Sequence, residues 1–148
     1  GIDLDPIYKI YKKIKHPGTN VCLFNPLLIN TSSTKSENNT AEPHYDTTIN
    51  AMRLSRRVTP VCTTVVYIEV PDEYAWGRLG LAKFGHTRGI DFVYIKPKVG
   101  RKVTFRGDAY HYVEPMYTEI PKKRISLVFE QYKLRPEEIQ KFGNIEVT

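Results

Sequence analysis

The sequence has little cysteine, with only Cys22 and Cys62 among its 148 residues. Two thiols are too few for a disulfide scaffold or for a zinc module built from clustered cysteines, so we expect two buried thiols in a reducing compartment. The chain also lacks internal repeats, a signal-peptide pattern and any apolar run near the roughly 20 residues of a membrane-crossing helix. We therefore expect one domain over residues 1–148, inside the cell and away from membranes, in the nucleus if the source is a eukaryote and otherwise in the cytoplasm.

The residues that are abundant favour strands, because the chain has ten Tyr and six Phe besides many Val, Ile and Thr. Short β-rich runs follow one another at regular spacing with turn signals between them. This pattern favours an antiparallel sandwich or jelly roll over an alternating βαβ fold. We predict strands over residues 21–29, 44–50, 61–70, 77–84, 90–96, 101–106, 109–114 and 123–132.

Three segments do not follow the β pattern: one before it, one within it and one after it. Asp5 and Pro6 begin a helix, with Asp5 as its N-cap, and the apolar stripe of that helix would pack on the outside of a sheet. Pro136 begins a short closing helix. Residues 31–42 have no apolar side chain larger than Ala, which predicts a mobile loop. Because this loop runs directly into the motif described next, we interpret it as a lid.

The first motif with candidate chemistry is His44-Tyr45-Asp46. Residues i and i+2 of a strand point to the same face, so His44 and Asp46 would direct a nitrogen and an oxygen at one point. A third ligand must come from elsewhere, and His111 is better placed than His16, at a helix end, or His86, in a turn between glycines. Two imidazoles and one carboxylate, with coordination positions left open, describe the facial triad of non-haem Fe(II) oxygenases.

The second motif is Arg124-Ile-Ser126, thirteen positions after His111. If residues 109–114 and 123–128 form a hairpin, His111 faces Arg124 on the same side of the sheet, with Cβ atoms about 5 Å apart. A guanidinium offers the paired donors that a carboxylate needs, and the Ser126 hydroxyl adds another donor. We therefore expect a metal and a carboxylate-binding arginine to share one cavity.

These motifs resemble those of the Fe(II)/2-oxoglutarate-dependent dioxygenases, which have His-x-Asp, a distal His, and then Arg-x-Ser on the following strand. The resemblance covers most of residues 20–132. It implies a mainly β fold, a double-stranded β-helix (jelly roll) with flanking short helices. It also implies an enzyme that uses Fe(II), O₂ and 2-oxoglutarate, with ascorbate as a stimulant. By position, it assigns the iron to His44, Asp46 and His111, and the distal carboxylate of 2-oxoglutarate to Arg124 and Ser126.

Within that superfamily, the segment from Arg124 to Lys133 closely resembles the last core strand of the TET/JBP group, which oxidises 5-methylpyrimidines in nucleic acid. Cys62-Thr-Thr-Val-Val66 is similar to another strand of that group. The implied reaction is hydroxylation of the 5-methyl group of 5-methylcytosine or thymine in DNA by a trimmed or minimal catalytic domain. Prolyl hydroxylases share the Gly-Asp-x-x-His-x-Val-Glu-Pro pattern of residues 107–115, so a protein side chain is the alternative target. A non-catalytic, cupin-like metal-binding module is the remaining alternative.

The net charge of +6 favours an anionic partner without identifying one. An enzyme that extrudes a base from DNA needs a stacking surface and cations for the flanking phosphates. The aromatic residues nearest to the motifs are Tyr45, Trp76, Tyr110 and Tyr112. The basic residues that we predict to contact phosphates are Arg53, Arg56, Arg57, Lys122 and Lys123. Core aromatics and solvated sheet edges are the structural interpretation of the same residues.

Overall fold

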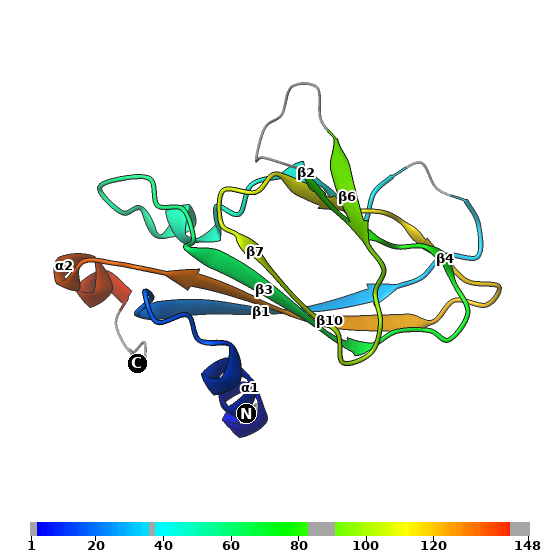
Figure 1. Ribbon diagram of the computed structural model, residues 1–148, viewed down its shortest axis with the longest axis horizontal. Coiled ribbons are helices and arrows are strands. Elements are labelled where there is room, and N and C mark those ends of the chain that lie inside the picture. Colours follow the sequence, from blue (N-terminus) through cyan, green and yellow to red (C-terminus); the bar gives the residue numbers. More distant parts are fainter. Residues whose placement is uncertain (1–2, 36–37, 83–90, 143–148) are drawn as a thin grey trace.

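The computed structural model describes residues 3–35, 38–82 and 91–142 and consists mainly of two packed antiparallel sheets (Figure 1). The first sheet has the order β1 (Val21–Asn30), β10 (Lys123–Tyr132), β3 (Cys62–Glu69), β7 (Lys102–Arg106). The second has the order β2 (Ala41–His44), β8 (His111–Val113), β5 (Leu79–Ala82), β6 (Phe92–Ile95). β4 (Ala75–Trp76) pairs with β9 (Met116–Tyr117) as a separate ribbon.

The chain crosses repeatedly between the two sheets as it runs from β1 to β10, although β5 and β6 are consecutive strands of one sheet, and these crossings make the fold a jelly roll. The predicted fold is therefore confirmed. The remaining elements are short helices: α1 (Asp5–Ile14), η1 (Thr48–Met52), α2 (Pro136–Ile139) and η3 (Gln140–Phe142). None of the helices in the described ranges is long and apolar enough to span a bilayer.

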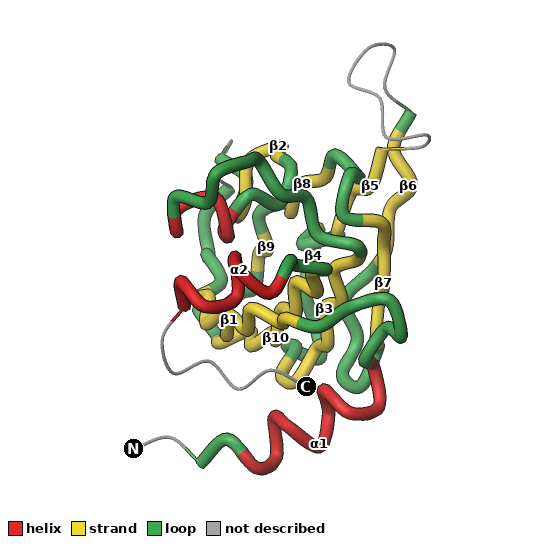
Figure 2. Tube along the Cα trace, turned by 90° about the vertical axis from the view of Figure 1, so that its left-hand side faces the viewer, coloured by secondary structure: helices red, strands yellow, loops and turns green. Residues whose placement is uncertain are grey.

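The helix α1 covers the outer face of the first sheet (Figure 2). Its Tyr11 packs with Leu127 and Phe129, which lie on the outward side of β10. The expected outer helix is therefore present, but its N-terminus differs from the prediction. Leu4 is the N-cap, and Asp5 lies in the first turn, where its backbone N–H donates to the Asp3 carboxylate. Because α1 seals the outer face, alternate residues of β10 remain free to face the space between the sheets.

Two apolar clusters bracket that space. Tyr67, Leu79, Val103 and Phe105 form one cluster from strands of both sheets. Val21, Ile49, Val58, Tyr132 and Leu134 form the other, which closes the end of the sandwich near η1. The cysteines lie in the first sheet and form no disulfide. Burial raises the pKa of the Cys22 thiol to about 12, so this group is an unreactive part of the packing.

The predicted strand over 44–50 is wrong beyond its first residue, because β2 ends at His44 and η1 begins at Thr48. The segment between them turns inward and lets Asp46 hydrogen-bond to Thr63 of β3. The expected loop over 31–42 is also shorter than predicted. Thr31 and Ser32 hydrogen-bond to the backbone of Lys122 and Met116, and β2 already begins at Ala41. Residues 36–37 lie outside the described part, so the lid stays a prediction.

The predicted hairpin between 109–114 and 123–128 does not form. β8 pairs with β2 and β5, whereas β10 pairs with β1 and β3. Between β8 and β10 the chain leaves the second sheet and runs through β9, which pairs with β4. Pro115 lacks the N–H that would extend the ladder of β8 towards β9. His111 and Arg124 therefore belong to opposite sheets.

Candidate metal centre and its cavity

Three ligand atoms converge at the end of β2. His44 is paired directly with His111 in the register of β2 and β8, and the two ring centroids lie 4.3 Å apart. Asp46 follows two residues after His44, and its Oδ1 lies 3.5 Å from His44 Nε2 and 3.3 Å from His111 Nε2. Candidate ligand atoms of all three residues lie within 4.8 Å of one another. The side chains therefore present two nitrogens and one oxygen to a common point.

Backbone carbonyls orient both imidazole rings. Nδ1 of His44 lies 2.6 Å from the carbonyl oxygen of Glu42, and Nδ1 of His111 lies 2.8 Å from that of Ala109. A carbonyl oxygen can only accept, so each Nδ1 carries the proton and donates it. In the neutral ring each Nε2 keeps a lone pair that can face a metal at the common point, whereas in the metal-free protein a protonated Nε2 of His44 donates to Asp46. The neutral ring with its proton on Nδ1 is the tautomer that a metal-binding histidine needs.

Asp46 is nearly buried and is held as a carboxylate. Burial alone would raise the pKa of Asp46, but hydrogen bonding with His111, His44 and Thr63 outweighs burial and holds this pKa below its usual range. Hydrogen bonding with Asp46 in turn raises the pKa of His44. Thr63 Oγ1 donates to Asp46 Oδ2 at 2.6 Å, which leaves Oδ1 for the common point. The set therefore contains one negative charge and two nitrogen ligands.

This donor set fits Fe(II). Two imidazoles and one carboxylate on one face of a metal leave the remaining positions open, as in the facial triad of non-haem iron oxygenases. Within residues 3–35, 38–82 and 91–142, no other group of three His, Cys, Asp or Glu side chains comes together in this way. His16 instead accepts a hydrogen bond from Gly18 N at its Nδ1. His86 lies outside the described residues.

Arg124 and Ser126 reach the same cavity from the opposite sheet. Both are 3% exposed, and both line a cavity of about 320 Å³ that also includes the three candidate ligands. Nη1 of Arg124 donates to the Gly77 carbonyl oxygen at 3.1 Å, and its guanidinium lies 5.4 Å from the ring centroid of Tyr67. The structure thus brings these five residues to one cavity, but from opposite sheets and not within one hairpin.

The guanidinium of Arg124 lacks a full set of partners. Its Nε is buried and makes no hydrogen bond within the described structure, and none of the ion pairs there includes this residue. Burial lowers the pKa of Arg124. A buried, unpaired cation costs free energy unless an anion joins it. An acidic ligand that enters the cavity would supply that anion, and a carboxylate matches the geometry of the guanidinium.

The motifs did not reveal two further polar residues of the cavity, Thr63 and Glu130. Glu130 lies on the same face of β10 as Arg124 and Ser126, six residues beyond Arg124. The two-residue period of the strand predicts this placement once it is extended past Ser126. No comparable signal identifies Thr63, because its contact with Asp46 depends on how the segment after β2 folds back.

The five basic residues predicted to contact phosphates come from two segments, 53–57 and 122–123, which lie near opposite ends of β10 (Figure 1). Arg56 forms a two-point ion pair with Glu138, which lies beyond the C-terminal end of β10. Lys123 is the first residue of the same ten-residue strand, and Lys122 precedes it. At about 3.3 Å per residue, the two groups are roughly 30 Å apart. A nucleic acid that contacted both groups would have to extend along the whole sheet.

The predicted aromatic residues also separate into two groups. Tyr45 and Tyr110 follow and precede the two ligand histidines, and their ring centroids lie 5.0 Å apart. Trp76 and Tyr112 are not among the residues that line the metal cavity. They line another hollow, of about 400 Å³, together with Tyr117. Tyr45 and Tyr110 do not line the metal cavity either, although each is adjacent in sequence to a ligand histidine.

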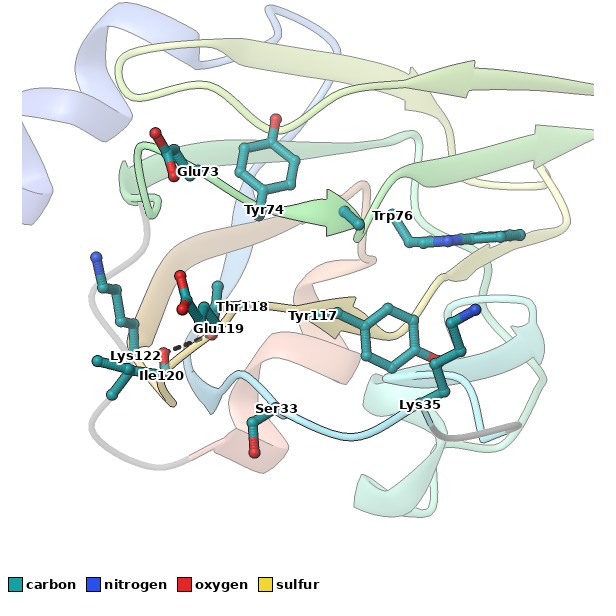
Figure 3. A pocket seen from close by; sticks show the side chains of 11 residues that line it. Ser33, Lys35, Glu73, Tyr74, Trp76, Tyr117, Thr118, Glu119, Ile120 and Lys122 are labelled. Carbon is teal, nitrogen blue, oxygen red and sulfur yellow. Dashed lines mark hydrogen bonds between the residues drawn. The ribbon is translucent and has the colours of Figure 1, made fainter.

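A further hollow, of about 490 Å³, also includes Trp76 (Figure 3). Tyr74, Tyr117 and Lys122 line it as well, and it shares no lining residue with the metal cavity. No cluster of metal ligands reaches it. This hollow is larger than the metal cavity, so volume alone would not identify the residues that can bind a metal.

Solved structures of similar fold come from the iron and 2-oxoglutarate oxygenases. A prolyl-4-hydroxylase from Pseudomonas putida matches with a TM-score of 0.54 and 16% identity, over 89% of this chain and 62% of its own. The fold is that of the 2-oxoglutarate oxygenases. An oxidoreductase of the 2OG-Fe(II) oxygenase family from Burkholderia pseudomallei matches with a TM-score of 0.51 and 14% identity, over 90% and 53% of the two chains. The protein IDO from Bacillus thuringiensis matches with a TM-score of 0.53 and 15% identity, over 88% of this chain and 54% of its own.

The likeness establishes the fold and not the activity, since identities of 14–16% are low. The chain spans about 53–62% of the length of these structures. No protein-family model matches the sequence. A search of curated proteins found no relative.

Proposed function

We propose that this chain is an Fe(II)- and 2-oxoglutarate-dependent oxygenase that hydroxylates a C–H bond. The proposal rests on one observation: a single cavity contains both a set of candidate metal ligands and a buried arginine. His44, Asp46 and His111 offer a facial set of ligands, and Arg124 offers a buried cation whose Nε has no partner. An acid that chelates a metal at one end and carries a second carboxylate at the other end would bind the metal and Arg124 at the same time.

Each of these residues has a definite task in this proposal. His44, Asp46 and His111 hold the iron on one face and leave the other face for the co-substrates. Arg124 and Ser126 bind the distal carboxylate of 2-oxoglutarate and so fix its orientation. When bound, the iron supplies the redox chemistry that couples O₂ and 2-oxoglutarate to oxidation of the target, and ascorbate would maintain its reduced state.

Succinate release tests this function. The protein is incubated with Fe(II), ascorbate and 2-oxoglutarate, with and without metal, and succinate is measured by mass spectrometry. We expect metal-dependent succinate that disappears in His111→Ala, and undiminished succinate in the control His16→Ala, since His16 lies outside the ligand cluster. A folded protein that binds Fe(II) but releases no succinate would instead be the cupin-like binding module.

For the target, we propose the 5-methyl group of a pyrimidine in DNA. The similarity of residues 124–133 to the last core strand of the TET/JBP group supports it, as does the net charge of +6. The Tyr45–Tyr110 pair supports it too, because these two contacting rings are adjacent in sequence to the ligand histidines and would offer a stacking surface to an extruded base. Arg53, Arg57, Lys122 and Lys123 are exposed and available to phosphates, so binding should weaken with salt.

A protein side chain is the second candidate target. The solved structure from Pseudomonas putida that shares this fold is described as a prolyl-4-hydroxylase. The shared Gly-Asp-x-x-His-x-Val-Glu-Pro pattern of residues 107–115 supports the same candidate. The separation of the two basic groups by about 30 Å weakens the DNA candidate relative to this one.

One experiment separates the two targets. The iron-loaded protein is given methylated DNA in one arm and a proline-containing peptide in the other, and both products are analysed by mass spectrometry. Hydroxymethylcytosine or hydroxymethyluracil would support the DNA target. A peptide gaining one oxygen, with unchanged DNA, would replace that target and leave the oxygenase proposal intact.

A further inference from the structure

Glu130 lies at the metal end of the cavity, opposite to Arg124. It is paired across the sheet with Thr63, the residue whose hydroxyl donates to Asp46. Arg124 lies six residues earlier on the same inward face of β10, about 20 Å away along the strand backbone. The strand therefore presents a cation at one end of the cavity and a carboxylate at the other.

The Glu130 carboxylate is buried without a cation. It is 4% exposed, and none of the ion pairs of the described residues includes it. Tyr132 donates its hydroxyl to Oε1 at 2.6 Å, and Thr48 donates its hydroxyl to Oε2 at 2.8 Å. These two neutral donors fix the orientation of the carboxylate.

These two donors do not occupy all the hydrogen-bond acceptor positions of the Glu130 carboxylate. Burial raises the pKa of Glu130, whereas the hydrogen bonds from Tyr132 and Thr48 favour its charged form. When ionised, a carboxylate can accept about four hydrogen bonds, so acceptor positions remain on a side chain that lines the cavity. Burial of a carboxylate without a full set of donors is unfavourable, and a ligand that brings an N–H group would remove that cost. A ligand that brings an oxygen acceptor would be repelled. The residue is thus suited to distinguish donors from acceptors.

We propose that Glu130 determines substrate specificity by accepting a hydrogen bond from an amino group of the target base, so that 5-methylcytosine is preferred over thymine. The inference rests on the proposed DNA target. The two bases carry the same 5-methyl group but differ beside it, since cytosine has an N4 amino donor where thymine has an O4 acceptor. Arg124 would then select the acidic co-substrate and Glu130 the base.

The test compares the two bases directly. Short single-stranded oligonucleotides that differ only in one 5-methylcytosine or thymine are titrated into protein loaded with Zn(II) and an inert 2-oxoglutarate analogue. The readout is fluorescence anisotropy, so it does not depend on turnover. We expect the wild-type protein to bind the 5-methylcytosine strand about tenfold more tightly, as expected for one discriminating base contact.

The variant Glu130→Gln keeps the shape but replaces one oxygen by an amide donor, which can serve thymine O4. We expect the variant to bind the two strands with about equal affinity or to prefer the thymine strand. The control Glu119→Gln removes an exposed carboxylate outside the metal cavity and should keep the preference. Co(II) affinity is measured in parallel by its visible spectrum. Unchanged Co(II) affinity in Glu130→Gln would show that this residue does not simply balance the charge of the metal.

Equal binding of both strands by the wild-type protein would overturn the inference, and this comparison needs no variant to fold. A preference that survives in Glu130→Gln, or a variant that loses Co(II) affinity but keeps the preference, would overturn it as well. If the wild-type protein binds neither strand but hydroxylates the peptide, the DNA target fails together with the inference while the oxygenase stands.

Discussion

Thr63 donates a hydrogen bond of 2.6 Å to Oδ2 of Asp46. Thr63 is 1% exposed, so water does not compete for the bond. One carboxylate oxygen is thereby engaged, and the other faces both ligand histidines. Contacts of this kind orient metal ligands from outside the coordination sphere.

Thr63→Val should therefore weaken metal binding while the fold is retained. Loss of an orienting partner typically costs about 10- to 100-fold in metal affinity. Titration with Co(II), followed by its visible spectrum, measures this loss. The matched control is Thr64→Val on the same strand, because the Thr64 hydroxyl contacts Thr104 and not a ligand. Equal affinities of wild type and Thr63→Val would show that Asp46 needs no orientation by Thr63.

Arg124→Ala should raise the concentration of 2-oxoglutarate needed for half-maximal succinate release by more than tenfold. The carboxylate would lose a charge-assisted partner, which contributes about 1.5–3 kcal/mol. Ser126→Ala should have a smaller effect, since a neutral hydrogen bond contributes about 1 kcal/mol. The half-saturation constants of both variants give the comparison. An unchanged constant in Arg124→Ala would remove this residue from the co-substrate site.

The metal-free protein should lose a stabilising interaction as the pH rises above 6.5. The pKa of His44 is raised from 6.5 by hydrogen bonding with Asp46, so the stabilisation is complete below 6.5 and is lost as the pH passes the raised value. The lowered pKa of Asp46 keeps its charge throughout, because that contribution is lost only well below 3.8. The difference in Tm between wild type and His44→Ala should shrink as the pH rises above 6.5.

Metal affinity should change in the opposite direction over the same interval. A metal binds the neutral imidazole, so protons compete with it less as the pH rises. Co(II) titrations at several pH values measure this dependence. A Tm difference that stays constant with pH, together with constant Co(II) affinity, would show that His44 does not exchange a proton for the metal.

Gly107→Ala should destabilise the fold. An ideal Cβ at this position would lie 1.7 Å from the Pro60 carbonyl oxygen, so the backbone between β7 and β8 would have to move. Forced shifts of this kind cost about 1–3 kcal/mol, which urea unfolding resolves. Gly18→Ala is the control, because its Cβ would meet only the exposed His16 ring, at 3.2 Å. Equal stability of the two variants would contradict the close packing at Gly107.

Local spacing brought together the residues of the candidate site only in part. His44, His111, Arg124 and Ser126 lie on strands, and the two-residue period places Arg124 and Ser126 on one face without knowledge of how the strands pair. Asp46 lies beyond the end of β2, so this period does not explain its position, although all five side chains line one cavity. The period even extends to Glu130, which the motifs left out.

Strand pairing could not be predicted in the same way. β10 pairs with β1, about a hundred residues earlier in the chain, because the apolar side chains of both strands pack under α1. A hairpin of β8 with β10 would be the shorter connection, and local spacing does not distinguish it from the observed pairing. The end of β2 at His44 could not be predicted from the sequence either, since it depends on the contact of Asp46 with Thr63 of another strand.

Calorimetric titration of 2-oxoglutarate tests the central claim most directly, because the claim is that one cavity binds this acid between a metal and Arg124. The protein is titrated without metal, with Co(II), and with Co(II) in the Arg124→Ala variant. We predict tight binding only in the second case, since each of the other two cases lacks one of the two anchors. Equal affinity in all three titrations would contradict the account.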